Sequence, residues 1–383
     1  MRLITMCLVF LLPCLGYGQA VISTPLFPYQ NDSITLTYDA SLGNGELVGI
    51  SPVFAHTGLI YGTSNNWQNV QGNWGTADSS VSMQSSGNDL HSINFHIPSY
   101  YGITGTSSSG PNALAFVFRN TSGSLVGRNS DQSDIFVPIY SSSSPLEVQW
   151  ASNKNVIEAL PNTSLTLNAG SSILANFNVF VDGNLVFVDS NTRSITPTIN
   201  IPNSLGIHSI VVQANQGSQS VTDSIILAVN NAIGVNQNVI IIPAYPTNQD
   251  TIDIVYDSLS GDRGTQGYIP LYLHTGVLTQ SSGMNWQNIQ GNWGTDDNNV
   301  RLSHLGGGVW HKRLHVNSFY SLSSIASSAT HLAMVVRDSS GTYVGKTSSG
   351  GDILHPLGYS SNSSGFNAAF VNGNVPIYLA IGD

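Results

Sequence analysis

The feature that most constrains this chain is a repeat the size of a whole domain. The segment NWQNVQGNWGT at residues 66–76 recurs at residues 285–295 with one change, Val to Ile, and the flanking segments recur in the same order. Short-period solenoids repeat every 20–50 residues or so, whereas this match runs through far more of the chain. We therefore predict two homologous modules, module A at residues 21–143 and module B at residues 236–361.

Apolar residues alternate with polar ones in short runs throughout the chain. SITLTYDA at residues 33–40 is one example, and clusters of Gly, Asn, Asp and Ser separate such runs. This period of two predicts antiparallel strands, and the close spacing of the turns is typical of β-sandwiches. The fold class is therefore all-β, with an immunoglobulin-like middle unit at residues 145–230 and a hairpin turn at Asp182-Gly183.

The N-terminus has the pattern of a secretory signal peptide. Residues 1–20 contain one early Arg, an apolar run and small residues near the end, which predicts cleavage near Gly18 or Ala20. The apolar run is too short for a membrane span. Both cysteines, Cys7 and Cys14, lie in this segment. We expect a secreted or cell-surface protein whose mature part contains no disulfide.

The C-terminal residues 366–383 resemble the opening strands of the middle unit in their pattern and in their place after a module. Eighteen residues are too few to bury a sandwich core, and domains that fold on their own rarely have fewer than about 40. We therefore expect a second immunoglobulin-like unit that is truncated here, so that the sequence is the front of a longer polypeptide. The alternative is that the tail adds a strand to an existing sheet.

The charge pattern bears on which partners are expected. Charged residues make up 8% of the chain and the formal net charge is −10, without a cluster of Lys and Arg. Phosphate binding needs such clusters, so nucleic acid is not an expected partner. A surface of amides and hydroxyls fits a neutral polysaccharide, although such surfaces also serve solubility. We expect a monomer.

The repeated segment carries two Trp residues at a spacing of seven. On an unbroken strand, residues seven apart point to opposite faces. Either Gly72 bends the segment so that both rings reach a ligand, or one Trp of each pair belongs to the core. Aromatic rings beside amides suit a sugar, which packs its apolar face on a ring and bonds the amides. The candidate carbohydrate-binding residues are His56, Trp67, Asn69, Gln71 and Trp74 in module A, and His274, Trp286, Asn288, Gln290 and Trp293 in module B.

Three repeated positions, those of His56, Arg119 and Asp134, also have structural interpretations. His56 and His274 could offer a ring nitrogen to a sugar hydroxyl, or could be partly buried residues bonded to a loop carbonyl. Arg119 lies before a Ser-Gly turn, and Asp134 closes the repeat. For these two residues and their counterparts in module B, we expect a structural salt bridge within each module.

These motifs together resemble a known family. The Tyr-Asp strand, HTG, NWQNVQGNWGT and LAFVFRN are similar to the accessory modules that precede the catalytic barrel in secreted α-amylase-family glycoside hydrolases of Bacteroidetes, and to the starch-binding modules of carbohydrate-binding families 25 and 26. The resemblance implies α-glucan binding by the Trp and His residues of both modules. Module A has FVF at residues 116–118, whereas module B has MVV at the matching residues 334–336, which implies an altered or weaker second site.

The sequence does not predict an enzyme in the residues present. Glycoside hydrolysis needs two carboxylates across a cleft, but the chain has three Glu residues and its Asp residues lie mainly in turns. No cofactor is expected, although a structural calcium ion could bind in the loop at residues 296–299. The expected function is a non-catalytic glucan-binding region of a longer hydrolase. The alternative is a structural, adhesive or protein-binding array of sandwiches in a surface glycan-uptake system.

Overall fold

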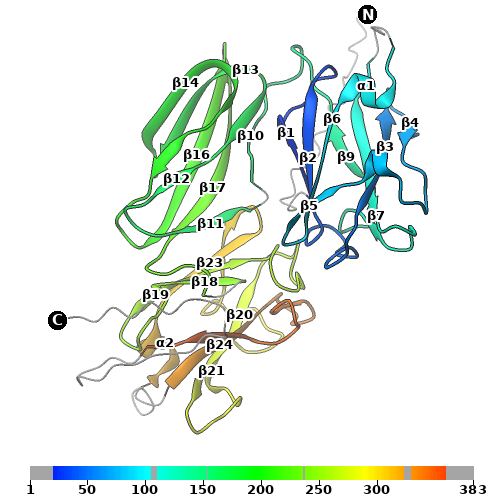
Figure 1. Cartoon of the computed structure of the whole chain (residues 1–383). Coiled ribbons are helices and arrows are strands. Elements are labelled where there is room, and N and C mark those ends of the chain that lie inside the picture. Colours follow the sequence, from blue (N-terminus) through cyan, green and yellow to red (C-terminus); the bar gives the residue numbers. More distant parts are fainter. Residues whose placement is uncertain (1–19, 105–109, 153, 236–237, 323–328, 359–383) are drawn as a thin grey trace, which may run out of the picture. The chain divides into compact units, whose positions relative to one another are not determined.

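The structure is a computed structural model (Figure 1). It describes residues 20–104, 110–152, 154–235, 238–322 and 329–358. The predicted tail at residues 366–383 and all of the predicted signal peptide except Ala20 lie outside these ranges. The chain divides into two compact units at Ile233 and Gly234, and each is described by itself. Among the described helices, none is long and apolar enough to cross a membrane.

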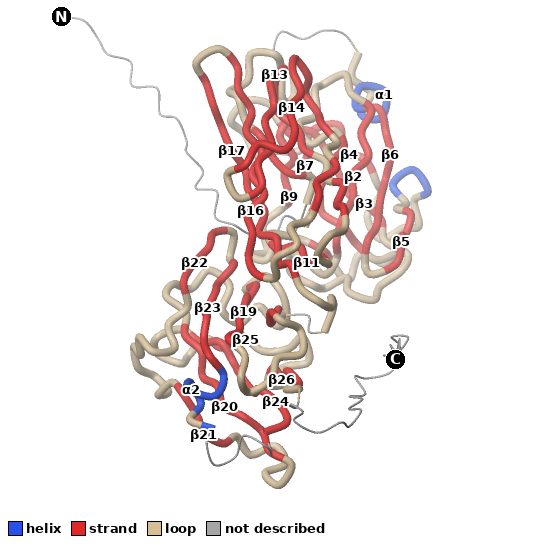
Figure 2. The backbone as a smooth tube through the Cα atoms, turned by 90° about the vertical axis from the view of Figure 1, so that its left-hand side faces the viewer, coloured by secondary structure: helices blue, strands red, loops and turns tan. Residues whose placement is uncertain are grey.

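Strands dominate the described residues, as the alternation predicts (Figure 2). The helices in this part of the chain are short: the 3-10 helix η1 (Ser79–Val81) and the α-helices α1 (Ile97–Tyr101) and α2 (Val316–Tyr320). The all-β class is therefore confirmed.

Module A consists of two sheets. Its strands are β1 (Val21–Thr24), β2 (Ser33–Asp39), β3 (Phe54–Ile60), β4 (Gln68–Gln71), β5 (Gln84–Gly87), β6 (Leu90–His96), β7 (Ala113–Arg119), β8 (Val126–Gly127) and β9 (Ile135–Pro138). One sheet has the order β1-β2-β6-β5 and the other β4-β3-β7-β8, with β9 also paired to β7.

The core of module A lies between these two sheets. Strand β2 buries every second residue, Ile34, Leu36 and Tyr38, and these side chains pack against Phe116 and Phe118 of β7 in one cluster. A strand of period two that buries one face against a second sheet is the unit of a β-sandwich.

Module B repeats this topology strand for strand. Its strands are β18 (Val239–Ile242), β19 (Thr251–Asp257), β20 (Tyr272–Thr279), β21 (Gln287–Gln290), β22 (Ser303–Gly306), β23 (Val309–His315), β24 (Ala329–Arg337), β25 (Val344–Gly345) and β26 (Ile353–Pro356). The two sheets have the orders β18-β19-β23-β22 and β21-β20-β24-β25, with β26 also paired to β24. The sequence repeat is thus a repeat of one sandwich.

The middle unit has its own buried cluster and a larger sheet. Its strands are β10 (Val148–Trp150), β11 (Val156–Ala159), β12 (Ser164–Thr166), β13 (Ala169–Val181), β14 (Asn184–Ile195), β15 (Thr198–Asn200), β16 (Gly206–Gln216) and β17 (Gln219–Val229). The predicted hairpin joins β13 to β14 through Asp182 and Gly183, with φ of 49° and 77°. One pairing departs from the antiparallel prediction, because β11 runs parallel to β17.

Candidate functional site

The repeated Trp segment of module A forms the edge strand β4 beside β3. Thr57 pairs with Gln71 and Leu59 with Gln68, so three steps along β4 match two along β3. This is a β-bulge, and Asn69 within it has a φ of 52°. A bulge adds one residue to a strand and redirects its side chains. The bulge therefore breaks the strict alternation on which the opposite-face argument for the two Trp residues depends.

Gly72 then turns the chain out of the strand. Its φ is 92°, and a Cβ atom there would lie 2.8 Å from the carbonyl oxygen of Ala55, so a side chain is excluded on both grounds. Trp74 follows in a turn and is 47% exposed, whereas Trp67, just before β4, is half-buried. Neither ring belongs to the core, which answers the question posed by the spacing of seven.

The two indole rings lie on either side of His56. The ring centroids of His56 and Trp67 are 5.7 Å apart with an interplanar angle of 27°, which is a stacked arrangement. Those of His56 and Trp74 are 5.2 Å apart at 90°, edge to face. We call His56, Trp67 and Trp74 the A cluster. Both geometries are favoured for aromatic pairs.

The imidazole of His56 is oriented by a loop carbonyl. Its Nδ1 atom lies 2.8 Å from the carbonyl oxygen of Gly72. Because a carbonyl oxygen only accepts, Nδ1 carries the proton, and Nε2 is the acceptor of the neutral ring. The bond to a loop carbonyl is the structural alternative expected for His56, and it fixes the tautomer that could accept from a ligand hydroxyl.

Two glycines support the indole rings. A Cβ atom on Gly58 of β3 would lie 3.2 Å from Cβ of Trp67, and one on Gly123 would lie 2.5 Å from Nε1 of Trp74. Gly123 belongs to the Ser-Gly turn after β7 and has a φ of 72°. The turn is recognisable in the sequence, but its contact with the Trp segment was not predicted. The signal that could have predicted it is the recurrence of Ser-Gly with Trp in both modules.

Arg119 has a different role from the predicted one. Its buried guanidinium donates from Nη2 to the carbonyl oxygens of Asn73 (2.6 Å) and Thr76 (3.0 Å), on either side of Trp74. From Nη1 it donates to the carbonyl oxygen of Asn120, at 3.1 Å, in the turn that contains Gly123. The planar fork of Arg suits such a set of acceptors. Arg119 therefore joins the Trp74 turn to the turn beneath it.

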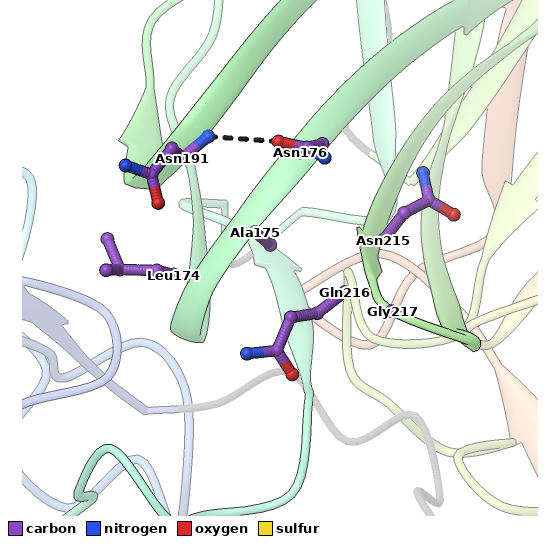
Figure 3. Close-up of a pocket in the computed structure, with 7 residues that line it drawn as sticks. All are labelled: Leu174, Ala175, Asn176, Asn191, Asn215, Gln216 and Gly217. Carbon is purple, nitrogen blue, oxygen red and sulfur yellow. Dashed lines mark hydrogen bonds between the residues drawn. The ribbon is translucent and has the colours of Figure 1, made fainter.

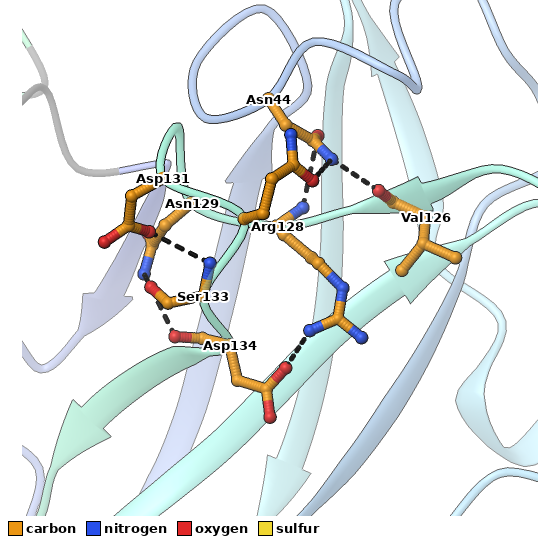
Figure 4. Close-up of polar contacts among 8 residues, drawn as sticks. Asn44, Val126, Arg128, Asn129, Asp131, Ser133 and Asp134 are labelled. Atoms are coloured by element: carbon orange, nitrogen blue, oxygen red, sulfur yellow. Dashed lines mark hydrogen bonds and ion pairs between the residues drawn. The ribbon is translucent and has the colours of Figure 1, made fainter.

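The prediction of a salt bridge between Arg119 and Asp134 is wrong. Asp134 pairs with Arg128, near the end of β8, in a network of turn residues (Figure 4). In module B, Arg337 likewise donates to the carbonyl oxygens of Asn292 (2.6 Å) and Thr295 (2.9 Å). The spacing of Arg and Asp in the repeat does not show that the Arg is buried beside main-chain acceptors.

The amides between the rings are mostly engaged with the protein. Asn69 donates from Nδ2 to the carbonyl oxygen of Tyr101 (2.9 Å), and Gln71 donates from Nε2 to that of Asn69 (3.2 Å). In module B, Asn288 donates to Tyr320 (2.8 Å) and Gln290 to Asn288 (3.4 Å). These bonds hold the bulge and α1 or α2 together, so the amides primarily shape the site.

Module B builds the same cluster from His274, Trp286 and Trp293, the B cluster. The centroid distances from His274 are 5.6 Å at 30° for Trp286 and 5.1 Å at 89° for Trp293, which is 50% exposed. Nδ1 of His274 lies 2.6 Å from the carbonyl oxygen of Gly291. The replacements Met334 and Val336 on β24 lie in the core of module B. They therefore do not alter the ring geometry.

An Asp side chain closes the Trp74 turn in module A. Asp78 accepts from the backbone N–H of Asn73 (3.1 Å) and from the hydroxyl of Ser80 (2.6 Å). These bonds, that of Ser80 first, lower the pKa of Asp78 below its usual value. In module B, Asp297 accepts from the N–H of Asn299 (2.9 Å). Asp78 therefore has a structural role in the turn.

Metal binding has little support. Within the described ranges, no group of three or more His, Cys, Asp or Glu side chains is placed to hold an ion. His311 on β23 instead bonds Asp253 of β19 at 2.8 Å, and Asp253 also bonds Arg313 at 2.9 Å. The calcium site suggested for residues 296–299 thus remains a prediction without a ligand set.

A separate hollow of about 270 Å³ lies in the middle unit (Figure 3). Its lining residues are Leu174, Ala175, Asn176, Asn191, Asn215, Gln216 and Gly217. Asn191 donates its N–H to the Asn176 side chain at 3.1 Å. The lining holds no titratable or nucleophilic group, so the hollow offers no acid–base chemistry. The A and B clusters are the stronger candidates because they occur twice.

Comparisons with known proteins find similarity only among solved structures. No family model and no curated protein matches the chain. Among solved structures, it is similar to fibronectin(III)-like modules of Clostridium thermocellum CbhA (22% identity, TM-score 0.18, covering 22% of this chain and 95% of that one). It is also similar to β-glucuronidase 3 of Bacteroides uniformis (12% identity, TM-score 0.22, covering 56% of this chain and 25% of that one). A third similar structure is titin A168169 (13% identity, TM-score 0.19, covering 53% of this chain and 92% of that one).

The strand order and sheet topology define the described part of the chain as an all-β array of sandwich modules. The described residues form no helix-alternating barrel, which is compatible with a non-enzymatic region.

Proposed function

We propose that the chain is a non-catalytic carbohydrate-binding region that holds a neutral polysaccharide at the A and B clusters. One observation carries the proposal: both modules hold an exposed Trp edge to face against a His, and the His ring lies at 27° or 30° to a second Trp, at distances that agree within 0.1 Å. A solvent-exposed indole is a large apolar surface that a protein normally buries. Its repetition in two modules indicates a ligand.

The chemistry of the clusters favours a sugar. The half-exposed rings of Trp74 and Trp293 offer an apolar face, and Nε2 of the adjacent His is an acceptor for a hydroxyl. The buried Arg behind each Trp is occupied by main-chain carbonyls, so it does not present a charge for an anionic ligand. The resemblance to families 25 and 26 narrows the polysaccharide to an α-glucan such as starch or glycogen.

Two modules on one chain make weak sites effective. When one cluster binds a polymer, the second meets it at an effective concentration set by the reach of the unit that joins the two modules. In this proposal, the region tethers a secreted α-amylase-family hydrolase to its substrate.

The test is affinity electrophoresis in gels that contain starch, glycogen or pullulan. We expect the chain to be retarded, Trp74→Ala and Trp293→Ala each to reduce the retardation, and the double variant to migrate as in a gel without glucan. Val188→Ala, which truncates a residue of β14 that is 61% exposed, is the control for loss of an exposed apolar side chain. Normal migration of the unmodified chain in all three glucans would falsify the proposal.

One observation favours the protein-binding alternative. Strand β14 pairs only with β13 among the described strands, and its Leu185 (56%), Val186 (47%) and Val188 (61%) are exposed. An exposed apolar edge strand is a template for pairing with another chain. This alternative predicts that Val188→Lys, but not Trp74→Ala, abolishes binding to a protein partner.

A further inference from the structure

The two clusters are alike, but module B has a second aromatic surface that module A lacks. The rings of Tyr268 and Tyr343 stack with centroids 3.7 Å apart and an interplanar angle of 21°. Tyr343 is 42% exposed. The residues at these positions of the repeat in module A are Ile50 and Leu125, and both pack against its core. Tyr268 likewise packs against the core of module B, partly buried, so an aromatic pair with one exposed ring has replaced an aliphatic pair.

Tyr343 belongs to the turn that supports Trp293. The turn is closed by hydrogen bonds between Asp338 and Tyr343: the N–H of Asp338 donates to the carbonyl oxygen of Tyr343 (3.0 Å), and the N–H of Tyr343 donates to Oδ1 of Asp338 (3.1 Å). Within it, Gly341 lies directly beneath the indole of Trp293, because a Cβ atom there would be 2.5 Å from Nε1.

This connection limits how far apart the two surfaces can be. Consecutive Cα atoms are about 3.8 Å apart, so the Cα atoms of Gly341 and Tyr343 are separated by at most about 7.6 Å. Arg337 also donates to the carbonyl oxygens of Asp338 (2.8 Å) and Asn292 (2.6 Å), which ties this turn to the one that carries Trp293. The same short turn therefore carries Tyr343 and the support of Trp293.

The tyrosine pair is suited to a neutral ligand. The hydroxyl of Tyr268 is uncharged at physiological pH, as that of an ordinary tyrosine is; a hydrogen bond with Tyr343, and burial after it, raise its pKa further, to about 12. In a stacked pair each ring covers one face of the other, and the outer face of the exposed Tyr343 can receive the apolar face of a sugar ring.

We propose that Tyr268 and Tyr343 extend the B cluster into a longer glucan-binding surface, so that module B favours longer glucan chains than module A. The inference rests on the proposed function, since it concerns the ligand of the same site. It assigns module B a chain-length preference set by residues outside the repeated Trp segment.

The experiment measures maltotriose and maltoheptaose binding calorimetrically in the full chain carrying Trp74→Ala, which leaves module B as the reporter. Adding Tyr268→Ile and Tyr343→Leu, the residues that module A has there, should leave maltotriose affinity unchanged and weaken maltoheptaose binding about three- to tenfold, the usual range for one aromatic contact. Tyr343→Phe keeps the ring and should retain the preference for maltoheptaose.

The reverse exchange is the matched control. In a chain carrying Trp293→Ala, the changes Ile50→Tyr and Leu125→Tyr should give module A a comparable gain for maltoheptaose alone.

The other outcomes of these titrations distinguish failure of the inference from failure of the proposed function. An unchanged ratio of the two affinities overturns the inference but leaves the proposed function standing. An equal loss for both sugars also overturns it, because the tyrosines then only support the turn. Absence of binding of both sugars in the Trp74→Ala chain and in the Trp293→Ala chain overturns the proposed function itself, and the inference with it.

Discussion

The replacement Gly123→Ala tests whether the support beneath Trp74 sets the geometry of the A cluster. The new Cβ atom would lie 2.5 Å from Nε1 of the indole, which is far inside van der Waals contact, so the ring must move. The variant is best made in a chain that carries Trp293→Ala, since module A then reports alone.

The structure supplies a control that separates the two effects of the substitution. Gly45 has the same φ as Gly123, 72°, but a Cβ atom there meets nothing within 4 Å. Both Gly→Ala changes place an L-residue in the left-handed region, at a cost of about 1–2 kcal/mol. Only Gly123→Ala displaces Trp74 from His56, which removes an aromatic contact worth about 0.5–1.5 kcal/mol beyond its buried area.

The assay combines urea unfolding with titration of maltoheptaose followed by Trp fluorescence. Both variants should unfold at lower urea concentration, whereas only Gly123→Ala should lose affinity, by about tenfold or 1.4 kcal/mol. If Gly123→Ala and Gly45→Ala bind maltoheptaose equally well, the support beneath Trp74 does not control binding, contrary to this prediction.

Three further predictions concern stability and processing. Arg119→Met should lower the free energy of unfolding by about 3 kcal/mol, because it removes charge-assisted hydrogen bonds. Arg128→Met removes one partner of a part-exposed ion pair and should lower it by at most about 1 kcal/mol. Urea unfolding of the two variants measures this difference. Burial lowers the pKa of His355 to about 4, so the unfolded chain binds more protons and stability falls as pH drops from 6.5 to 4. His355→Val, the residue that module A has there, should remove this loss of up to about 3 kcal/mol in acid titrations. Ala20 is buried and its carbonyl accepts a backbone hydrogen bond, so mass spectrometry of the exported chain should find cleavage after Gly18, and an N-terminus at residue 21 contradicts this.

The fold was largely predictable because alternation and repetition are local signals. Strand β2 buries Ile34, Leu36 and Tyr38 as its period of two requires, and Asp182-Gly183 forms the expected hairpin turn. The parallel pairing of β11 with β17 was not predictable in this way. Alternation specifies which face of a strand is buried, but it carries no information on which neighbour the strand meets or in which direction.

The site was predictable in composition but not in the roles of its parts. The Trp and His residues do come together, yet Asn69 and Gln71 bond the protein, and Arg119 binds carbonyls instead of Asp134. Main-chain carbonyls are invisible in a sequence because every residue has one. From the sequence alone, a carboxylate is therefore the expected partner of a buried Arg, even where the fold surrounds the Arg with backbone acceptors.

The comparison of the modules shows what fixes the cluster geometry. The cores differ where Phe116 and Phe118 become Met334 and Val336, yet the distances between His and Trp rings agree within 0.1 Å. What the modules share is the bulge, the glycine beneath the exposed Trp and the buried Arg, all of which act on the backbone. The clusters therefore depend on main-chain contacts more than on core packing, which leaves the core and the surrounding surface free to differ between two copies of one site.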